Sequence, residues 1–418
     1  MFNKISVIGL GYIGLPTAAM FASKKVKVIG VDRNPSVVDT INSGEIHIVE
    51  PFLDSIVKDV VNEGHLSGAI TPEPADAFLI AVPTPFKKSD SPIPEPDLNF
   101  IEDAVKLIAP VLKKGDLVIL ESTSPVGTTE KIAEWLADLR DDLVFPNHCN
   151  DNCDVNIAHC PERVLPGKII KELVENDRVI GGITESCSKR AADLYKIFVK
   201  GECVLTNART AEMSKLTENA CRDVQIAFAN ELSMVCDNLD IDVWELISLA
   251  NRHPRINILN PGPGVGGHCI AVDPWFIVSR SPDQAKLMLE ARNVNILKTN
   301  WAVDKIKTAL TDISTKLNKP INKLNVAYLG LAFKPNIDDL RESPALDVVN
   351  KLIDFGAQYV CVEPNIGYLT EHPLATIDEA VNNSDLIVSL VKHDQFIDRK
   401  SDILSSKSEI LDFCGLNK

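Results

Sequence analysis

Three glycines near the start of the chain constrain its fold most strongly. Gly9, Gly11 and Gly14 follow a short apolar strand, residues 5–8, and open a predicted helix. In this spacing the first glycine makes a tight turn, the second lets a pyrophosphate approach the backbone, and the third lets helix and strand pack. Asp32 ends the next predicted strand, where a carboxylate can bind ribose hydroxyls and repel a 2′-phosphate. The pattern predicts a dinucleotide site that prefers NAD over NADP.

Apolar strands alternate with helical stretches in both halves of the chain. This alternation indicates parallel, doubly wound sheets, and the second set of strands repeats the first with little sequence similarity. Ligands of such sheets bind beyond the carboxyl ends of the strands, where Thr84 and Thr123 fall. The expected fold class is α/β, with two Rossmann-type doubly wound parallel sheets joined by a helical middle domain. Strands are predicted at residues 5–8, 26–31, 75–83, 116–121, 324–329, 359–362 and 384–391.

Two long helices are predicted between the sheets. One covers residues 210–238, where apolar side chains recur at helical spacing. The other runs to about residue 313, with Ser281 as its N-cap and Pro282 in its first position. So much apolar helix surface indicates a homodimer interface, and the alternative is packing within one chain only. The expected domains are residues 1–205, 206–315 and 316–418.

The composition excludes several classes of protein. The 418 residues carry 43 Lys and Arg against 58 Asp and Glu, a net charge of −15, which disfavours binding to nucleic acid or to an anionic membrane. No uninterrupted apolar run approaches the roughly 18 residues of a membrane span, so we expect a cytoplasmic protein. The ten cysteines are too sparse for a disulfide scaffold. One group of potential metal ligands lacks any standard zinc spacing, and we predict no metal there: His148, Cys149, Cys153, His159 and Cys160.

A thiol lies in a glycine-rich segment, residues 262–273, which we call the cysteine loop; the thiol is Cys269. A nicotinamide enzyme that oxidises an alcohol once needs no thiol. One that carries the same carbon on to a carboxylate gains from a thiol, because the aldehyde can be held covalently as a thiohemiacetal and oxidised again. Together, the glycine fingerprint and Cys269 predict a dehydrogenase that oxidises its substrate twice.

Three polar residues share one face of the first long helix. Lys215, Asn219 and Arg222 are spaced four and three residues apart. A lysine ammonium and an amide N–H at adjacent turns can bracket a developing alkoxide, because both donate to it. The alternative is an exposed polar stripe with Glu212 and Glu218 as partners.

Two basic segments are further candidate sites. The second Rossmann-type unit lacks the later glycines, and there Lys334 and Arg341 can meet a diphosphate by charge and hydrogen bonds. The alternative is that both pair with the acidic residues 338, 339 and 342. Residues 252–255, Arg-His-Pro-Arg, precede the cysteine loop and can grip a sugar nucleotide, or they form a solvated basic turn.

The chain resembles the nucleotide-sugar 6-dehydrogenases, typified by UDP-glucose dehydrogenase, over almost its whole length. The motifs that carry the resemblance lie at residues 9–14, 82–85, 121–127, 161–163, 211–219, 264–269 and 333–344. Within the family, segments 252–257 and 266–274 look closest to the enzymes of bacterial surface-polysaccharide synthesis that act on UDP-N-acetylmannosamine. His268 and Val272 stand where the glucose enzymes usually have Ser and Lys.

The resemblance implies catalytic roles residue by residue. Cys269 resembles the nucleophile, Lys215 the general acid/base or alkoxide stabiliser, and Asn219 an oxyanion donor beside it. Asp273 and Thr123 resemble the groups that organise the hydrolytic water.

The resemblance also implies binding residues. Glu162 falls where the family has an acid near the reacting end, and Arg255 matches a loop that can come from the other subunit. Arg341 matches an arginine that reaches either the cofactor or the substrate diphosphate. The NAD contacts implied are Gly9, Gly11, Tyr12, Ile13, Gly14, Asp32, Thr84, Thr123 and Arg341. The UDP-sugar contacts implied are Arg163, Val164, Lys215, Asn219, Arg222, His253, Arg255, Gly264 and Lys334.

The implied reaction converts UDP-N-acetylmannosamine, two NAD and water to UDP-N-acetylmannosaminuronate and two NADH. Several alternatives stay open at this point. The substrate could be UDP-N-acetylglucosamine, UDP-N-acetylgalactosamine or UDP-glucose. The protein could be a β-hydroxyacid-type dehydrogenase that oxidises once, or a non-catalytic regulator that binds NAD and a UDP-sugar.

Overall fold

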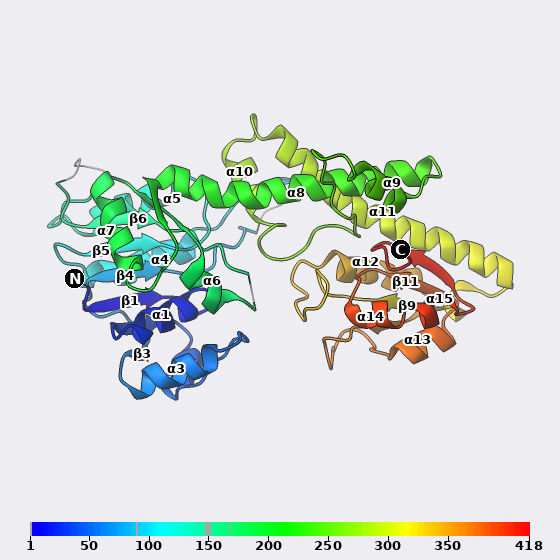
Figure 1. The fold of residues 1–418 in the computed structure, drawn as a ribbon, viewed down its shortest axis with the longest axis horizontal. Helices are drawn as coiled ribbons and strands as arrows, with labels where there is room; N and C mark the ends of the chain where they lie inside the picture. Colours follow the sequence, from blue (N-terminus) through cyan, green and yellow to red (C-terminus); the bar gives the residue numbers. More distant parts are fainter. Residues whose placement is uncertain (1, 89–90, 147–151, 166) are drawn as a thin grey trace. The chain divides into compact units, whose positions relative to one another are not determined.

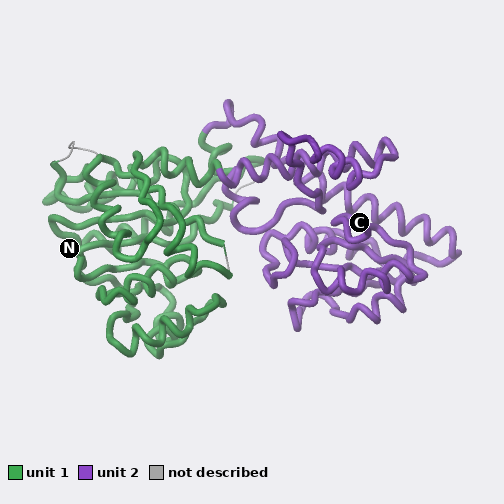
Figure 2. Tube along the Cα trace, viewed as in Figure 1, with its two compact units in different colours: residues 1–217, 275–280 green, residues 218–274, 281–418 purple. Residues whose placement is uncertain are grey.

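The computed structural model describes residues 2–88, 91–146, 152–165 and 167–418. The chain divides into two compact units, which Figure 2 shows in different colours. Unit 1 comprises residues 1–217 and 275–280, and unit 2 comprises residues 218–274 and 281–418. The boundary falls inside a long helix, α8 (Ala208–Asn238), which covers the range predicted for the first long helix. The division into three domains stays a prediction.

An eight-stranded sheet forms the centre of unit 1 (Figure 1). Its strand order is β3-β2-β1-β4-β5-β6-β7-β8. Successive strands are added on one side of β1 up to β3 and on its other side from β4 onward, and ligands of such sheets bind at the point between β1 and β4 where this change occurs. The first six strands are parallel, as predicted, and β7 pairs antiparallel with β6. The strands are β1 (Lys4–Ile8), β2 (Lys27–Val31), β3 (Leu66–Ala69), β4 (Ala77–Ile80), β5 (Leu117–Leu120), β6 (Asn156–His159), β7 (Arg178–Gly182) and β8 (Cys203–Asn207).

Helices cover both faces of this sheet, because its strands are apolar on both faces. Along β1 and β4, Val7 and Leu79 face one core while Ile8 and Ile80 face the other. The first core includes α1 (Gly14–Ser23), α2 (Pro35–Asn42), α3 (Leu53–Asn62), α6 (Ile169–Glu175) and α7 (Glu185–Tyr195). The second includes α4 (Asn99–Ile108), the short η1 (Ala109–Val111) and α5 (Thr128–Leu139).

The second long helix, α11 (Lys286–Leu317), begins later than predicted. Ser281 and Pro282 open a turn instead, in which the N–H groups of Gln284 and Ala285 donate to the Ser281 carbonyl at 3.2 and 2.9 Å. The predicted N-cap at Ser281 is therefore wrong. Ser followed by Pro suits the first two positions of a turn as well as the start of a helix, and the sequence does not distinguish the two. Two shorter helices, α9 (Val243–Ala250) and α10 (Asp273–Arg280), lie between α8 and α11 in the chain.

Unit 2 contains a second parallel sheet, with strand order β10-β9-β11-β12 (Figure 1). One of its cores includes α11 and α12 (Pro344–Leu352), and the other includes α13 (Ile377–Asn383), α14 (Asp394–Asp398) and α15 (Lys400–Leu404). The predicted second Rossmann-type sheet is thus confirmed. The remaining elements are β9 (Asn325–Leu329), β10 (Gln358–Val362), β11 (Leu386–Ser389), β12 (Glu409–Asp412), η2 (Ile321–Lys323) and η3 (Ile353–Phe355). None of the helices in the described part of the chain is long and apolar enough to span a membrane.

Candidate active site

The glycine fingerprint of unit 1 forms a turn with one open position. A side chain at Gly14 would place its Cβ 1.8 Å from the Gly9 carbonyl oxygen, and one at Gly9 would meet the Ala81 carbonyl at 2.6 Å. These two positions are therefore filled by the chain itself. At Gly11 a Cβ would meet nothing within 4 Å, which leaves the space that a bound pyrophosphate needs. Ile13 is the N-cap of α1 and supplies no side-chain cap. In the first turn of the helix, the Leu15 N–H donates to the Gly11 carbonyl at 3.1 Å and Pro16 has no N–H, so the Gly14 N–H is the one left for a phosphate.

Asp32 lies beside this turn, directly after β2. Its carboxylate accepts hydrogen bonds from the N–H groups of Leu10 (3.1 Å) and Asn34 (2.9 Å) and is half-buried. The turn thus holds a negative charge at the position where ribose hydroxyls bind and a 2′-phosphate would be repelled. The neighbouring Arg33 guanidinium lies over the Phe100 ring at 4.8 Å.

Two threonines follow neighbouring strands of the same sheet. The Thr84 Oγ1 atom, after β4, is buried and has no hydrogen-bond partner among the described residues. Thr123, after β5, is half-buried, and its neighbour Ser122 donates a hydrogen bond from Oγ to the Val82 carbonyl at 2.7 Å. A buried hydroxyl without a partner and an open glycine turn both fit a nucleotide cofactor at this edge. Tyr12, the other predicted contact, is exposed.

Lys215 and Glu212 are one turn apart on α8. One of the two interpretations of the sequence made Glu212 an exposed partner of Lys215, and the structure shows that Glu212 is not exposed. It is buried and accepts hydrogen bonds from the Gly127 N–H (2.6 Å), the Thr129 N–H (2.8 Å) and the Thr129 hydroxyl (2.6 Å). The Lys215 ammonium is half-buried and, within the described residues, has no hydrogen bond or ion pair. It is therefore a cation available to a ligand.

Asn219 and Asp273 form the closest polar contact of unit 2 near the predicted site. The Asn219 amide donates from Nδ2 to Asp273 Oδ2 at 2.5 Å, and Asp273 is buried at the start of α10. The Asp273 N–H donates to the Cys269 carbonyl at 2.8 Å, so that residues 269–273 form a single turn. Cys269 is half-buried. The structure therefore joins three of the predicted catalytic residues, the thiol, the amide and the carboxylate, through one short chain of contacts.

The cysteine loop packs directly on residues 331–343 of the same unit, a segment that we call the lysine loop because it carries Lys334. The Gly267 N–H donates to the Arg341 carbonyl at 3.1 Å. A Cβ at Gly266 would lie 2.4 Å from the Glu342 carbonyl, and one at Gly267 would lie 2.8 Å from the Phe333 ring. Only glycine allows the two loops to approach this closely. Gly264 is equally enclosed, because a Cβ there would lie 2.5 Å from Thr299 Oγ1.

The basic candidates lie at the surface. Arg341 forms a bidentate pair with Asp339, from Nε at 2.9 Å and from Nη2 at 2.6 Å, and its side chain is 51% exposed. Lys334 is half-buried. Arg222, His253 and Arg255 are exposed, and the turn that carries the last two is closed by two hydrogen bonds between the Asn251 side chain and the backbone of Ile258 (2.7 and 2.9 Å).

Comparison with known proteins shows which family contains this combination of domains. The models of the UDP-glucose/GDP-mannose dehydrogenase family match the chain in three parts: the NAD binding domain at residues 3–199, the central domain at 209–296 and the UDP binding domain at 327–415. The chain belongs to this family. It is 59% identical to the UDP-N-acetyl-D-mannosamine dehydrogenase of Campylobacter jejuni, over 99% of both chains, and 60% identical to that of Escherichia coli K12, over 94% of both. The structure of the UDP-D-ManNAc dehydrogenase from Pyrococcus horikoshii matches with a TM-score of 0.87 and 39% identity, over 99% of this chain and 96% of that one.

Membership of the UDP-glucose/GDP-mannose dehydrogenase family confirms the resemblance that the motifs predicted. The protein is an NAD-dependent dehydrogenase with a UDP binding domain. The second sheet belongs to the UDP binding domain. In a β-hydroxyacid-type dehydrogenase this sheet would have no function. The individual site residues stay predictions, although the structure places Gly9, Gly14 and Asp32 around one turn.

Glu162 of this family member lies in a buried ionic network of unit 1. Its carboxylate pairs with Arg178 at 2.7 Å, and it accepts a hydrogen bond from the Arg163 N–H at 2.8 Å. The Arg178 guanidinium lies over the Tyr195 ring at 4.6 Å. Val164 packs against the first core of unit 1. The catalytic role predicted for Glu162 stays a prediction, and its carboxylate already has a cationic partner.

Glu121 belongs to the same network and was not predicted as a site residue. It follows β5, two residues before Thr123, and its carboxylate accepts a hydrogen bond from the Tyr195 hydroxyl at 2.5 Å. Burial raises the pKa of Glu121 to about 7. The sequence carries two signals for it: it is a charged residue that ends an apolar strand, and it opens the motif at residues 121–127.

The group considered as metal ligands includes two residues, His148 and Cys149, that lie outside the described residues. His159 and Cys160 are fully buried at the end of β6. Burial lowers the pKa of His159 to about 3 and raises that of Cys160 to about 12, and Arg178 lies 3.6 Å from the Cys160 sulfur. Among the described residues, no group of three or more His, Cys, Asp or Glu is arranged to hold a metal ion.

Proposed function

We propose that the protein oxidises UDP-N-acetyl-D-mannosamine at C6 to UDP-N-acetyl-D-mannosaminuronate, in two steps and with two NAD. The observation that carries the proposal is the identity of 59–60% to dehydrogenases named for this substrate over at least 94% of each chain. The thiol, the lysine and the amide that two successive oxidations require are all present, at Cys269, Lys215 and Asn219.

The first oxidation needs a group that removes the proton of the C6 hydroxyl. We assign this role to Lys215, whose amine nitrogen takes up the proton directly or through a water molecule and is an ammonium afterwards, because its side chain has no other hydrogen-bond partner within the described residues. The glycine turn and Asp32 would hold NAD, which would supply the hydride acceptor for the C6 carbon. The residues around Gly11 and Thr84 fit a bound nucleotide, since one leaves open space and the other an unpaired hydroxyl.

Cys269 gives up its thiol proton to solvent, and the thiolate then adds to the C6 aldehyde. A C–S bond forms, the carbonyl oxygen becomes an alkoxide, and the product is a thiohemiacetal that keeps the half-oxidised sugar bound. Lys215 and Asn219, one turn apart on α8, donate to that alkoxide. Loss of a second hydride converts the thiohemiacetal to a thioester.

Hydrolysis of the thioester ends the cycle. Water adds to the thioester carbon, the C–S bond breaks, and the proton released from the water returns Cys269 to its thiol form. Asp273 is placed to orient this water, because its turn begins at Cys269 and its carboxylate is held by the Asn219 amide at 2.5 Å. Thr123 is the second proposed water ligand. We propose that Lys334 and Arg341 bind the diphosphate, with Arg163, Val164, Arg222, His253, Arg255 and Gly264 as further substrate contacts.

A parallel assay of purified protein tests the proposal. UDP-N-acetylmannosamine, UDP-N-acetylglucosamine, UDP-N-acetylgalactosamine and UDP-glucose are supplied separately with NAD, and NADH and uronate are quantified. We expect two NADH per uronate and the highest kcat/KM for the mannosamine sugar. One NADH per substrate contradicts a double oxidation, and preference for another sugar contradicts the substrate. A Cys269→Ala variant is the control for a non-catalytic regulator, which shows no turnover in either form.

We also propose that the protein is a homodimer that assembles through the helices of unit 2. Large apolar side chains are exposed there, including Phe228 on α8 (57%), Leu249 on α9 (58%) and Leu287 on α11 (69%). Light scattering should give twice the 45.8 kDa chain mass, and a Phe228→Asp/Leu249→Asp variant should give the mass of one chain. If Arg255 acts across the interface, that variant also loses turnover. A wild-type protein that stays monomeric at micromolar concentration contradicts the dimer. The cytoplasmic location stays a prediction.

A further inference from the structure

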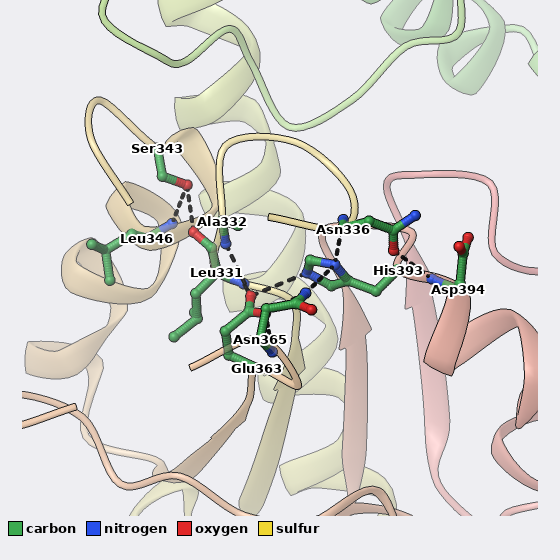
Figure 3. Close-up of polar contacts among 9 residues, drawn as sticks. All are labelled: Leu331, Ala332, Asn336, Ser343, Leu346, Glu363, Asn365, His393 and Asp394. Atoms are coloured by element: carbon green, nitrogen blue, oxygen red, sulfur yellow. Dashed lines mark hydrogen bonds and ion pairs between the residues drawn. The ribbon is translucent and has the colours of Figure 1, made fainter. Parts of the chain in front are cut away.

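The UDP binding domain contains a buried histidine–glutamate pair at the edge of its sheet. We infer that Glu363 and His393 are positioning residues that hold the lysine loop, residues 331–343, in the conformation that receives the UDP diphosphate. The inference rests on the proposed function of this loop, and it is carried by the hydrogen bonds that Figure 3 draws. Neither residue lies in a motif that carries the family resemblance.

The turn that Glu363 holds repeats the NAD turn of unit 1 bond for bond. The Gly9 N–H donates to the carbonyl at the end of β2 at 2.8 Å, and the Gly330 N–H donates to that at the end of β10 at 2.9 Å. The next N–H in each turn, of Leu10 and of Leu331, donates to the carboxylate of Asp32 (3.1 Å) or Glu363 (2.7 Å).

The acidic residues agree in their other contact as well. The residue two positions later donates its N–H back to the second carboxylate oxygen, from Asn34 to Asp32 at 2.9 Å and from Asn365 to Glu363 at 3.2 Å. Glu363 therefore occupies the position of the ribose-binding carboxylate in a dinucleotide site.

His393 occupies the position of Thr84. The strand registers pair Ile80 with Ile8 in the first sheet and Ser389 with Leu329 in the second, and each site residue follows four positions after its strand end. Thr84 keeps a buried hydroxyl without a partner among the described residues. His393, at the equivalent place, is fully buried and lies 3.1 Å from Glu363, between Nε2 and Oε2.

In unit 2, His393 and Glu363 thus close the end of the sheet that stays open for a cofactor in the sheet of unit 1. Asp32 is half-buried and reachable, whereas the Glu363 side chain is fully buried. Glu363 Oε2 accepts from the N–H groups of Leu331 (2.7 Å) and Ala332 (3.1 Å) as well as from His393. The Glu363 carboxylate therefore anchors the lysine loop and is not available to a ribose.

The hydrogen bonds fix the form of His393. The Asn336 N–H can only donate, and it points at His393 Nδ1 at 2.9 Å, so Nδ1 is an acceptor. Nε2 therefore carries the proton and donates to Glu363. Burial by itself raises the pKa of Glu363, but the hydrogen bonds from His393, Leu331 and Ala332 outweigh it, and the net shift is downward. The imidazole thus donates through Nε2 to a carboxylate whose pKa is lowered.

These contacts hold the lysine loop at its start, middle and end. The start, Leu331 and Ala332, bonds to Glu363. In the middle, Asn336 has a left-handed backbone (φ 62°) and is held from both sides, because its N–H donates to His393 and its Oδ1 accepts from the Asp394 N–H at 2.9 Å. At the end, the Ser343 hydroxyl donates to the Leu331 carbonyl at 2.6 Å (Figure 3).

Lys334 lies between the first two anchors, and Arg341 lies before the third. The pair therefore limits the positions of the cation proposed to meet the diphosphate. The cysteine loop depends on the same segment, since the Gly267 N–H donates to the Arg341 carbonyl. Loss of the pair is expected to weaken UDP binding first, because a loop that must be ordered on binding reduces affinity.

Binding of UDP alone, measured by calorimetry on the full-length protein, tests the inference. We expect His393→Leu and Glu363→Gln to weaken UDP binding about tenfold, which corresponds to the loss of about one hydrogen bond to a charged group, and to leave NAD binding unchanged. In kinetics, the KM for the UDP-sugar rises more than kcat falls. His372→Leu is the matched control, because His372 is also buried in unit 2 and bonds to Tyr359 (3.1 Å) away from the loop. A folded His393→Leu protein that binds UDP as tightly as the wild type overturns the inference.

Hydrogen exchange on the wild type keeps the test independent of the folding of the variants. Without UDP, the amides of Leu331, Ala332 and Asn336 should exchange slowly, as those of a pre-formed loop. Exchange at the rate of an unstructured segment overturns the inference. A wild type that binds UDP but oxidises none of the four sugars overturns the proposed function and leaves the pair standing, whereas one that does not bind UDP overturns both.

Discussion

The contact between Asn219 and Asp273 connects the two halves of the proposed chemistry. In the proposed reaction, Asn219 donates to the alkoxide, and in the structure its amide also donates to Asp273, the carboxylate proposed to orient water. The Asn219 amide donates to Asp273 Oδ2 at 2.5 Å and so orients this carboxylate, which is buried in the first turn of α10. A carboxylate held in this way can direct a water molecule toward the thioester without forming a covalent bond itself.

Asp273→Asn should separate the oxidations from the hydrolysis. The amide keeps the size of the side chain and loses its charge, so the water is no longer activated. We expect a burst of NADH in the first turnover, followed by a steady-state kcat reduced by roughly 10²–10³. Stopped-flow absorbance measures both phases. Asp283→Asn, an exposed residue of the same unit, is the control. A variant that loses the burst in proportion to kcat contradicts a role confined to hydrolysis.

Some site residues could be predicted from the sequence and others could not, for a physical reason. Gly9, Gly14 and Asp32 act within one turn and one strand, so their spacing in the chain reports their geometry. Glu121 and Glu212 bond to partners 74 and 83–85 residues away, which no local pattern encodes.

At the scale of elements, a buried carboxylate, Glu212, and an exposed ion pair, Arg209–Glu130, join α8 to α5. Glu212 accepts three hydrogen bonds at the start of α5, from Gly127 and Thr129, and burial raises its pKa. The same turn of α8 carries Lys215. The segment before α5 carries Thr123, and so two proposed catalytic residues depend on this junction.

Glu212→Gln should loosen that junction. An amide has one acceptor oxygen where the carboxylate has two, so at least one buried donor loses its partner. We expect a loss of about 1–3 kcal/mol in the free energy of unfolding and a lower kcat. Chemical denaturation and steady-state assays measure the two effects. Glu231→Gln, at an exposed site on the same helix, should change neither. Equal stability of Glu212→Gln and the wild type contradicts the anchor.

Glu121 gives the first sheet a predictable response to pH. Burial raises its pKa to about 7 in the folded protein, from an ordinary value of 4.5, so the folded state binds this proton more tightly than the unfolded state. The resulting stability is complete below about pH 4.5 and is lost as pH rises through about 7.

Glu121→Gln removes this titration while keeping an acceptor for Tyr195. Between pH 5 and 8 the wild type should therefore lose stability relative to the variant, by up to about 3 kcal/mol. Denaturation curves across this range measure the difference. Glu185→Gln, whose side chain is 73% exposed, should run parallel to the wild type. Parallel curves for Glu121→Gln and the wild type contradict the buried titration.

Elements were predicted well where packing and chain-local signals agree. The seven predicted strands are confirmed as β1, β2, β4, β5, β9, β10 and β11, whereas β3, β6, β7, β8 and β12 lie outside the predicted ranges. The start of α11 differs from the prediction, because Ser281 and Pro282 open a turn, which this residue pair suits as well as a helix start.

At the scale of the whole chain, one turn is used twice for two ligands. The first copy, at Gly9 and Asp32, stays open at the nucleotide edge. The second copy, at Gly330 and Glu363, is closed by His393, and its loop carries Lys334 instead. Sequence periodicity predicted the repeat of the sheet. The closure could not be predicted, since it depends on a pair 30 residues apart in the chain.

Covalent capture by Cys269 is the claim on which the proposed four-electron oxidation depends. The direct measurement is the rate of free uronate formation by a Cys269→Ser variant, with UDP-N-acetylmannosamine and NAD in excess. Serine keeps the shape of the side chain but forms no stable thiohemiacetal or thioester, so we expect the rate to fall by roughly a thousandfold or more. A serine variant that produces free uronate at the wild-type rate contradicts the account.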